Sequence, residues 1–389
     1  MIPYGRQHID EQDIEAVVAV LKSGWLTQGP AVDRFEECIR DYVGAKYAVA
    51  VSSGTAGLHL AAIAAGVGPG KALVTSPITF VASSNAALYV GGSPLFADVD
   101  PATVNMSPDC LRATLARHKN VRAVVPVHFG GLPCDMEAIG PIARDAGATI
   151  IEDAAHALGA TYPDGSRVGN GKYAVMTMFS FHPVKAIAAG EGGMLTTNDE
   201  KIYRHLLRLR SHGINKLDDP LEVVVEAETD GMKNPWYHEM QELGYHYRIT
   251  DIQCALAIAQ FKRLEQFLAR RRTLVAQYDR AFADFENLRP AQGQREISGH
   301  HIYVVRIDFA KAKTTRAKLM RDLRGRDIVS QVHYIPVPMQ PVYRRLGMTP
   351  RDYPNALKYY DEALTIPLFY DLTDAQQEHV IGTLKELVR

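Results

Sequence analysis

The stretch VMTMFSFHPVKAIAAGEGGMLTTND, residues Val175–Asp199, places a single lysine between two β-rich runs. The first run, VMTMFSFHP, is apolar enough for a buried strand, and the second, GGMLTTND, follows a glycine-rich turn. Lys185 lies between them among small residues, where a lysine side chain is normally unfavourable. The stretch alone leaves two interpretations open: a surface charge beside a loop, or a nucleophilic amine in a pocket.

Strand and helix patterns alternate on the N-terminal side of this stretch. Short β-rich runs, among them KALVTSP, SPLFADVD, VRAVVPVHFGG and GATIIEDAAHALGA, each end at a turn. Helical patterns over Val81–Val90, Ser107–His118 and Met136–Ala146 separate most of them. This βα alternation predicts an α/β fold with a mostly parallel sheet that helices cover on both faces.

The C-terminal part has a different pattern. Residues Ile249–Phe282 predict a long helix with one break, and HHIYVVRIDF and DIVSQVHYIPV predict strands of a smaller α+β unit. We therefore predict a large domain over 1–250 and a small one over 251–389, with roughly the first 12 residues packing on the small domain. Residues 214–236 lose all periodicity and are expected to form an irregular excursion.

The composition excludes several classes of protein. The 43 basic and 44 acidic side chains give a net charge of −1, which argues against a nucleic-acid surface or a polybasic membrane patch. The four cysteines form no CxxC pair, and no metal site is expected. The start, MIPYGRQHID, has no apolar signal core. The sequence therefore predicts a cytoplasmic enzyme without nucleic-acid or membrane partners.

Two further turns of the predicted sheet carry polar groups. In VSSGTAGLH a strand passes into a helix at Gly54, whose first N–H groups favour an anion such as a phosphate, although an ordinary capped helix is the alternative. There is no GxGxxG or GxxxxGK[ST] motif. In TIIEDAAHALGA a buried strand ends at Asp153, which is either a helix cap or a site acid, with His156 three residues later.

The combination of these features favours pyridoxal phosphate as a cofactor. Its phosphate needs an anion site, its pyridine nitrogen needs a carboxylate, and its aldehyde needs an amine such as that of Lys185. All three groups follow strands of one predicted sheet, whose carboxyl ends form the usual ligand site. Ser180 offers a further hydroxyl to the phosphate, and Phe80 offers a ring face.

Nearly from end to end, the chain resembles the DegT/DnrJ/EryC1/StrS group of pyridoxal-phosphate-dependent nucleotide-sugar aminotransferases. The motifs that carry the resemblance are LTQGPAVDRFE, SSGTAGLHLA, TFVAS, IEDAAHALGA, FSFHPVK, GEGGMLTTND, RSHG and GYHYRITDIQCALA. The resemblance implies a fold-type I transferase with a mostly parallel seven-stranded sheet and a smaller α+β C-terminal domain. Within the group, IPYGRQ, FSFHPVK and QVHYIPV look most similar to the aminotransferases of pseudaminic acid biosynthesis.

The resemblance implies a role for each matching residue at the cofactor. Lys185 would carry pyridoxal 5′-phosphate as an internal aldimine and move protons, while Asp153 would pair with the pyridinium nitrogen. His156 would lie against the ring near its hydroxyl. The remaining contacts would come from Thr55, Ala56 and Ser180 at the phosphate and from Phe80 on the ring face.

The resemblance also implies the substrates. L-glutamate would give its amino group to the 4-keto carbon of UDP-2-acetamido-2,6-dideoxy-β-L-arabino-hex-4-ulose, in a ping-pong reaction through pyridoxamine phosphate. The pocket for the sugar nucleotide would be lined by Tyr4, Leu26, Thr27, Gln28, Gly29, Gln331, Val332, His333 and Tyr334. The alternatives are another UDP- or dTDP-4-keto-6-deoxy sugar, or a non-catalytic binding protein. Related sugar dehydratases have histidine in place of the lysine, so the presence of Lys185 argues against a dehydratase.

One position departs from the family pattern. The family commonly has asparagine in a GxNxR motif that the neighbouring subunit contributes to the phosphate, and here GYHYR places His246 there. An imidazole can also donate a hydrogen bond to a phosphate, and the alternative is a packed interface histidine. The resemblance therefore implies a homodimer with shared active sites.

Overall fold

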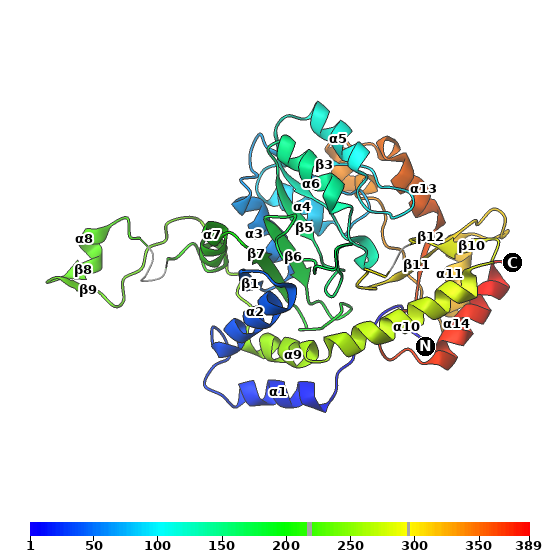
Figure 1. Ribbon diagram of the computed structural model, residues 1–389, viewed down its shortest axis with the longest axis horizontal. Helices are drawn as coiled ribbons and strands as arrows, with labels where there is room; N and C mark the ends of the chain where they lie inside the picture. The colour runs from blue at the N-terminus through cyan, green and yellow to red at the C-terminus, as the bar shows by residue number, and fades with distance from the viewer. Residues whose placement is uncertain (216–219, 294–295) are drawn as a thin grey trace.

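The computed structural model describes residues 1–215, 220–293 and 296–389. Its centre is a seven-stranded sheet in the order β1-β7-β6-β5-β4-β2-β3, in which only β7 runs antiparallel to its neighbours (Figure 1). The strands are β1 Tyr47–Val51, β2 Ala72–Thr75, β3 Ser93–Phe96, β4 Val121–Val125, β5 Thr149–Asp153, β6 Met176–Ser180 and β7 Gly193–Thr197. The predicted α/β fold with a mostly parallel seven-stranded sheet is confirmed.

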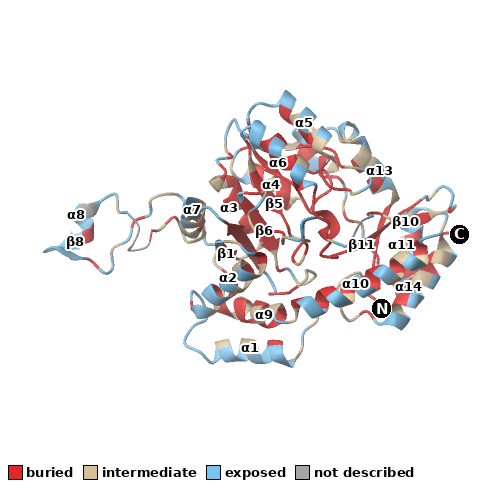
Figure 2. Ribbon diagram, viewed as in Figure 1, coloured by how far each residue is buried: buried red, intermediate tan, exposed pale blue. Residues whose placement is uncertain are grey.

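Alternate residues of the strands enter two separate cores, one on each face of the sheet. In β1, Ala48 and Ala50 pack in one core, whereas Val49 and Val51 pack in the other, as the two-residue period of a strand requires. The first core is covered by α2 Pro30–Val43, α5 Pro108–Arg117, α6 Met136–Asp145 and α9 Asp251–Phe261. The second is covered by α3 Gly54–Ala64, α4 Ala82–Tyr89 and α7 Glu200–Arg210. Both faces of the sheet are therefore buried (Figure 2).

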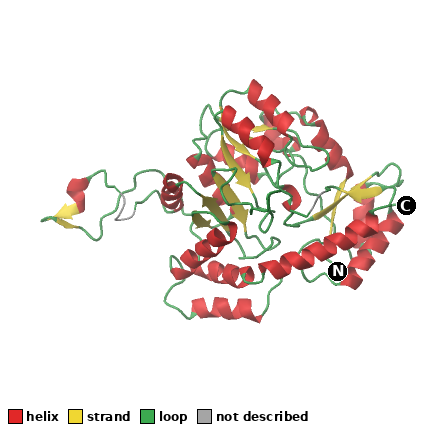
Figure 3. Cartoon of the chain, in the orientation of Figure 1, coloured by secondary structure: helices red, strands yellow, loops and turns green. Residues whose placement is uncertain are grey.

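A second, antiparallel sheet lies towards the C-terminal end (Figure 3). Its strands are β10 Leu288–Pro290, β11 Tyr303–Ile307 and β12 Ala363–Ile366. The helices of the C-terminal part are α10 Leu264–Phe282, α11 Arg316–Arg324, α12 Pro341–Arg345, α13 Pro354–Glu362 and α14 Asp374–Leu387. Short 3-10 turns occur at η1 Phe129–Gly131, η2 Val337–Met339 and η3 Pro350–Asp352.

The long helix α10 joins the two units. Leu268 belongs to the core of the large sheet, whereas Leu274 belongs to the core that α10 forms with the small sheet. The N-terminal Ile2 packs in this second core and bridges to Ile328. The α9–α10 pair has the break that the helical pattern predicted, and α1 Glu11–Leu21 packs along α9. The domain boundary at residue 250 remains a prediction.

The strand expected in DIVSQVHYIPV is wrong. Gln331 makes only an isolated bridge to Thr365, and the chain then turns through the 3-10 segment that contains Pro338. Proline lacks the N–H that a strand ladder needs, so the two prolines of this segment, Pro336 and Pro338, end any pairing. The segment instead carries His333 and Tyr334 towards the large sheet, where both line a cavity.

An arm of residues 220–243 projects from the body beyond α7 (Figure 1). It carries α8 Val224–Ala227 and the short strands β8 Glu228–Thr229 and β9 Met232–Lys233. The excursion expected over 214–236 includes residues 216–219, which lie outside the described residues. None of the helices in the described parts of the chain is long and apolar enough to span a membrane.

Candidate active site

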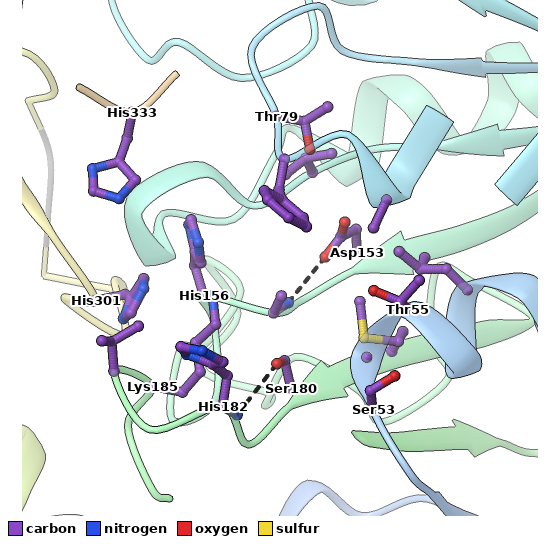
Figure 4. Close-up of a pocket in the computed structure, with 18 of the residues that line it drawn as sticks. Ser53, Thr55, Thr79, Asp153, His156, Ser180, His182, Lys185, His301 and His333 are labelled. Carbon is purple, nitrogen blue, oxygen red and sulfur yellow. Dashed lines mark hydrogen bonds between the residues drawn. The ribbon is translucent and has the colours of Figure 1, made fainter. Parts of the chain in front are cut away.

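A cavity of about 470 Å³ opens where β5 and β6 end and α3 begins (Figure 4). Parallel strands bring their carboxyl ends to one edge of a sheet, so segments far apart in the sequence meet there. Of the residues predicted for the site, the cavity is lined by Tyr4, Thr55, Phe80, Asp153, His156, Ser180, Lys185, His333 and Tyr334. The structure therefore brings the lysine, the aspartate and the helix start into one pocket.

Lys185 lies in a turn after β6 that backbone hydrogen bonds hold in place. Its N–H donates to the carbonyl oxygen of His182 at 2.8 Å, and Phe181 N–H donates to Gly192 O at 2.9 Å. Burial lowers the pKa of Lys185 from 10.5 to about 8, although the nearby Asp153 carboxylate opposes this shift. At neutral pH roughly a tenth of the Lys185 side chains are therefore neutral amines, the nucleophilic form, which is a far larger share than for an ordinary lysine.

Asp153 ends β5 on the opposite side of the pocket. Its Oδ2 accepts a hydrogen bond from Ser83 Oγ at 2.6 Å, and its Oδ1 accepts one from the N–H of Ala155 at 3.1 Å. Burial raises the pKa of this carboxyl group, while these donors and Lys185 act in the opposite direction. Ser83, which the sequence did not single out, is linked in turn to Thr79 at 2.7 Å. The carboxylate is thus fixed in place and faces a cationic partner.

The start of α3 forms a third wall of the cavity. Ser53 caps the helix by accepting the N–H of Ala56 at 3.1 Å, so this amide is engaged within the protein. A Cβ on Gly54 would lie 3.1 Å from Cβ of Ser180, which shows how closely the helix start approaches the end of β6. The first-turn N–H groups have no acceptor inside the helix, and together with the Ser180 hydroxyl they suit an anion.

The fourth wall consists of histidines and an aromatic ring. His156 and His301 lie with their ring centroids 4.2 Å apart, and Tyr334 Oη is 3.2 Å from His156 Nε2. Burial holds the pKa of His156 and of His301 well below the ordinary value and lowers that of His333 to about 4. These imidazoles are therefore neutral. His301 was missed because HHIYVVRIDF was considered only as a strand, although a histidine pair before a buried strand is unusual.

The matches to known proteins agree with this geometry. The model of the DegT/DnrJ/EryC1/StrS aminotransferase family matches residues 7–385. The chain belongs to this family. It is 38% identical to the spore coat polysaccharide biosynthesis protein SpsC of Bacillus subtilis, over 100% of this chain and 97% of that protein.

Solved structures of sugar aminotransferases share the fold. The putative sugar aminotransferase Spr1654 of Streptococcus pneumoniae, in its PMP form, has a TM-score of 0.90 at 29% identity, covering 100% of this chain and 99% of that chain. Helicobacter pylori PseC, an aminotransferase involved in the biosynthesis of pseudaminic acid, has a TM-score of 0.89 at 26% identity, with the same coverage of both chains.

As a member of the DegT/DnrJ/EryC1/StrS family, the chain is a sugar aminotransferase that uses pyridoxal 5′-phosphate. The residues of the cavity fit this cofactor. The α3 start and Ser180 suit its phosphate, the buried carboxylate of Asp153 suits a pyridinium nitrogen, and the amine of Lys185 suits an aldehyde. The assignment of each residue to one part of the cofactor remains a prediction.

Several residues predicted for the family site lie outside the cavity lining of their own chain. His246 is exposed at the base of the arm, with its ring 5.4 Å from that of His212. Gly29 N–H and Ala31 N–H bind the carboxylate of Asp251, which holds the start of α2. The other residues outside the lining are Leu26, Thr27, Gln28, Ala56, Gln331 and Val332. Their roles at the cofactor or sugar remain predictions.

Proposed function

We propose that this aminotransferase moves the amino group of L-glutamate onto the 4-keto carbon of UDP-2-acetamido-2,6-dideoxy-β-L-arabino-hex-4-ulose, in pseudaminic acid biosynthesis. The observation that carries the transamination is the pair formed by the half-buried Lys185 and the buried Asp153 on facing walls of one cavity. The similarity to PseC supports the choice of sugar. The sequence motifs IPYGRQ and QVHYIPV support it as well.

The chain's own residues would carry the proton transfers. Lys185 would move a proton within each half of the reaction: as a neutral amine it would take the α-proton of the amino donor and pass it to the cofactor, and in the second half it would take a proton back from the cofactor and deliver it to the sugar carbon. When bound, pyridoxal phosphate supplies a ring that spreads the negative charge left on the carbon. Asp153 would hold the pyridine nitrogen in its protonated form, because a carboxylate fixed by Ser83 and Ala155 attracts that proton.

The sugar nucleotide would enter from the side of the cavity that the C-terminal unit closes. Tyr4 and His333 contact each other there, with ring centroids 5.4 Å apart, and both line the cavity with Tyr334. We place the sugar against these three side chains. The nucleotide would extend towards the run Leu26–Gly29.

We further propose a homodimer that shares its active sites. His246 is exposed and lies outside the cavity of its own chain, so its predicted phosphate contact requires a partner subunit. All four cysteines are free thiols, which supports a reducing compartment such as the cytoplasm.

The decisive experiment tests the acceptor and the stereochemistry together. The holoenzyme is incubated with L-glutamate and a panel of UDP- and dTDP-linked 4-keto-6-deoxy sugars, and the configuration at the aminated carbon is read by NMR. We expect turnover of the UDP-linked β-L-arabino ketose and none with Lys185→Ala. Exclusive turnover of a dTDP-linked sugar, or amination on the opposite face, would refute the proposed substrate.

A further inference from the structure

One wall of the cavity contains a directed chain of hydrogen bonds that starts at a backbone amide. The N–H of Gly130 donates to Nδ1 of His156 at 3.3 Å. Gly130 has φ of 65°, and a Cβ there would lie 2.8 Å from Oε1 of Gln292, so this turn and its amide direction depend on glycine. A backbone N–H can only donate, so Nδ1 of His156 must present its lone pair.

This contact fixes the tautomer of His156. With its lone pair at Nδ1, a neutral imidazole carries its single hydrogen on Nε2. Nε2 lies 3.2 Å from the hydroxyl oxygen of Tyr334. His156 therefore donates this hydrogen to Tyr334, and Tyr334 acts as the acceptor in the pair.

The hydroxyl hydrogen of Tyr334 is then left for another acceptor. Burial raises the pKa of Tyr334, so the phenol keeps its hydrogen. Among the described residues, no acceptor for this hydrogen is found other than His156, whose Nε2 is occupied. The ring is held by Phe129 at 6.4 Å and by His156 at 6.2 Å, and the residue lines the cavity next to Phe80. The hydroxyl hydrogen of Tyr334 is therefore available to a ligand bound in the cavity.

We propose that Tyr334 is a catalytic residue that donates a hydrogen bond to a bound oxygen, and that Gly130 and His156 set the direction of this bond. The oxygen is an electron-rich one, either the phenolic oxygen attached to the cofactor's pyridine ring or the keto oxygen of the sugar. This proposal rests on the proposed function, because both oxygens belong to a sugar transamination. It involves no transfer of the phenol's proton, only a fixed donor of the oxyanion-hole kind.

The test uses the holoenzyme and the variant Tyr334→Phe, which keeps the ring and removes the hydroxyl. The first readout is the midpoint pH of the visible absorbance change of the bound cofactor, measured without any sugar. Loss of a donor to the phenolic oxygen of the cofactor should raise this midpoint by about one pH unit. A hydrogen bond to a charged group contributes a free energy that corresponds to a pKa shift of about this size. The second readout is the rate of each half-reaction, measured separately with L-glutamate and with the keto sugar.

The two readouts distinguish the two oxygens. A shifted midpoint assigns the donor to the cofactor. An unchanged midpoint, with a keto-sugar half-reaction slower by about 100-fold and a normal glutamate half-reaction, assigns it to the sugar. If neither the midpoint nor the keto-sugar rate changes, Tyr334 only packs, and the proposal is overturned. Tyr360→Phe is the control, because this phenol lies against Arg316 in the C-terminal unit.

Two substitutions of His156 test the direction of the chain. A glutamine places its amide near the position of Nε2 and can donate to Tyr334, whereas an asparagine places its amide near Nδ1. Whichever quantity Tyr334→Phe changes, the absorbance midpoint or the keto-sugar rate, we expect His156→Asn to change it more than His156→Gln does. Equal losses would contradict the assigned direction. Failure of the wild-type enzyme to turn over any keto sugar would refute the proposed function alone, because the absorbance midpoint is measured without sugar.

Discussion

Lys185 lies in an environment that lowers the pKa of its amine. Its pKa of about 8 predicts that capture of pyridoxal phosphate by the apoenzyme depends on pH in the physiological range. Only the neutral amine attacks an aldehyde, so the capture rate should fall by about tenfold per pH unit below this pKa and level off above it. The measurement is the stopped-flow absorbance change on mixing apoenzyme with cofactor. Lys185→Ala supplies the background from surface lysines, and a rate still rising steeply near pH 10 would contradict the shift.

Asp153 can be tested by a change that keeps its shape. Asp153→Asn retains an oxygen for Ser83 or Ala155 but removes the negative charge, so the cofactor should still bind while the half-reaction with L-glutamate slows by about 100- to 1000-fold. Asp164→Asn is the control, because Asp164 is a partly exposed carboxylate paired with Lys172. A variant that turns over at the wild-type rate would remove Asp153 from its assigned role.

The site residues that stand out from the sequence pattern itself lie at or shortly after the end of a strand, whereas Tyr4, His333 and Tyr334 were expected only from the family resemblance. Asp153 and Lys185 stand out because a charged group directly after a buried strand is unusual in one sequence. Ser83 and His301 have no such signal. The position of Ser83 depends on where α4 packs, and that of His301 depends on how the chain enters β11. Both are set by tertiary packing rather than by the local sequence.

Strand β7 holds the start of α3, the predicted phosphate site, in place. Gly193 pairs with both Val51 and Ser180, and a Cβ on it would lie 2.5 Å from the carbonyl oxygen of Ser53. This contact involves backbone, which cannot move aside without shifting the start of α3. The packing of β7 and the position of the α3 start therefore depend on one another at this glycine.

Gly193→Ala should weaken both stability and cofactor binding. We expect a loss of about 1–3 kcal/mol in the free energy of unfolding, because the methyl group overpacks a rigid contact. We also expect a higher dissociation constant for pyridoxal phosphate, measured by fluorescence titration. Gly382→Ala in α14 is the control, since no atom lies within 4 Å of its added Cβ, and it should stabilise the helix by about 0.5–1 kcal/mol. Equal behaviour of the two variants would refute the argument.

The predicted elements succeeded where the pattern was local. Helices predicted at Val81–Val90 and Met136–Ala146 occur as α4 and α6. Asp135 caps α6 from the position just before the predicted segment, whereas α4 has no side-chain cap. The strand predicted in DIVSQVHYIPV failed because pairing requires a partner elsewhere, and the segment makes only two isolated bridges, from Ile328 to Ile2 and from Gln331 to Thr365, before the prolines that follow Tyr334. The antiparallel direction of β7 likewise follows from its neighbours in the sheet rather than from its own residues.

The arm of residues 220–243 is mostly exposed (Figure 2). Trp236 is 73% exposed and Leu243 is 75% exposed, and Val225, Met232 and Met240 are exposed as well. Exposed apolar side chains gathered on a projecting segment mark an interaction site. In the proposed homodimer, this segment would pack on the partner and fix the position of His246.

Trp236→Lys should therefore weaken the dimer. A buried tryptophan in an interface commonly contributes ~2 kcal/mol or more, so the dimer dissociation constant should rise by more than about tenfold in sedimentation equilibrium. Leu346→Lys is the control, because Leu346 is a half-exposed apolar residue of the C-terminal unit, far along the chain from the arm. If His246 serves the partner's phosphate, specific activity should fall at protein concentrations where Trp236→Lys becomes monomeric and recover as the concentration rises. A variant that stays dimeric, or a monomer with full activity, would contradict the shared active site.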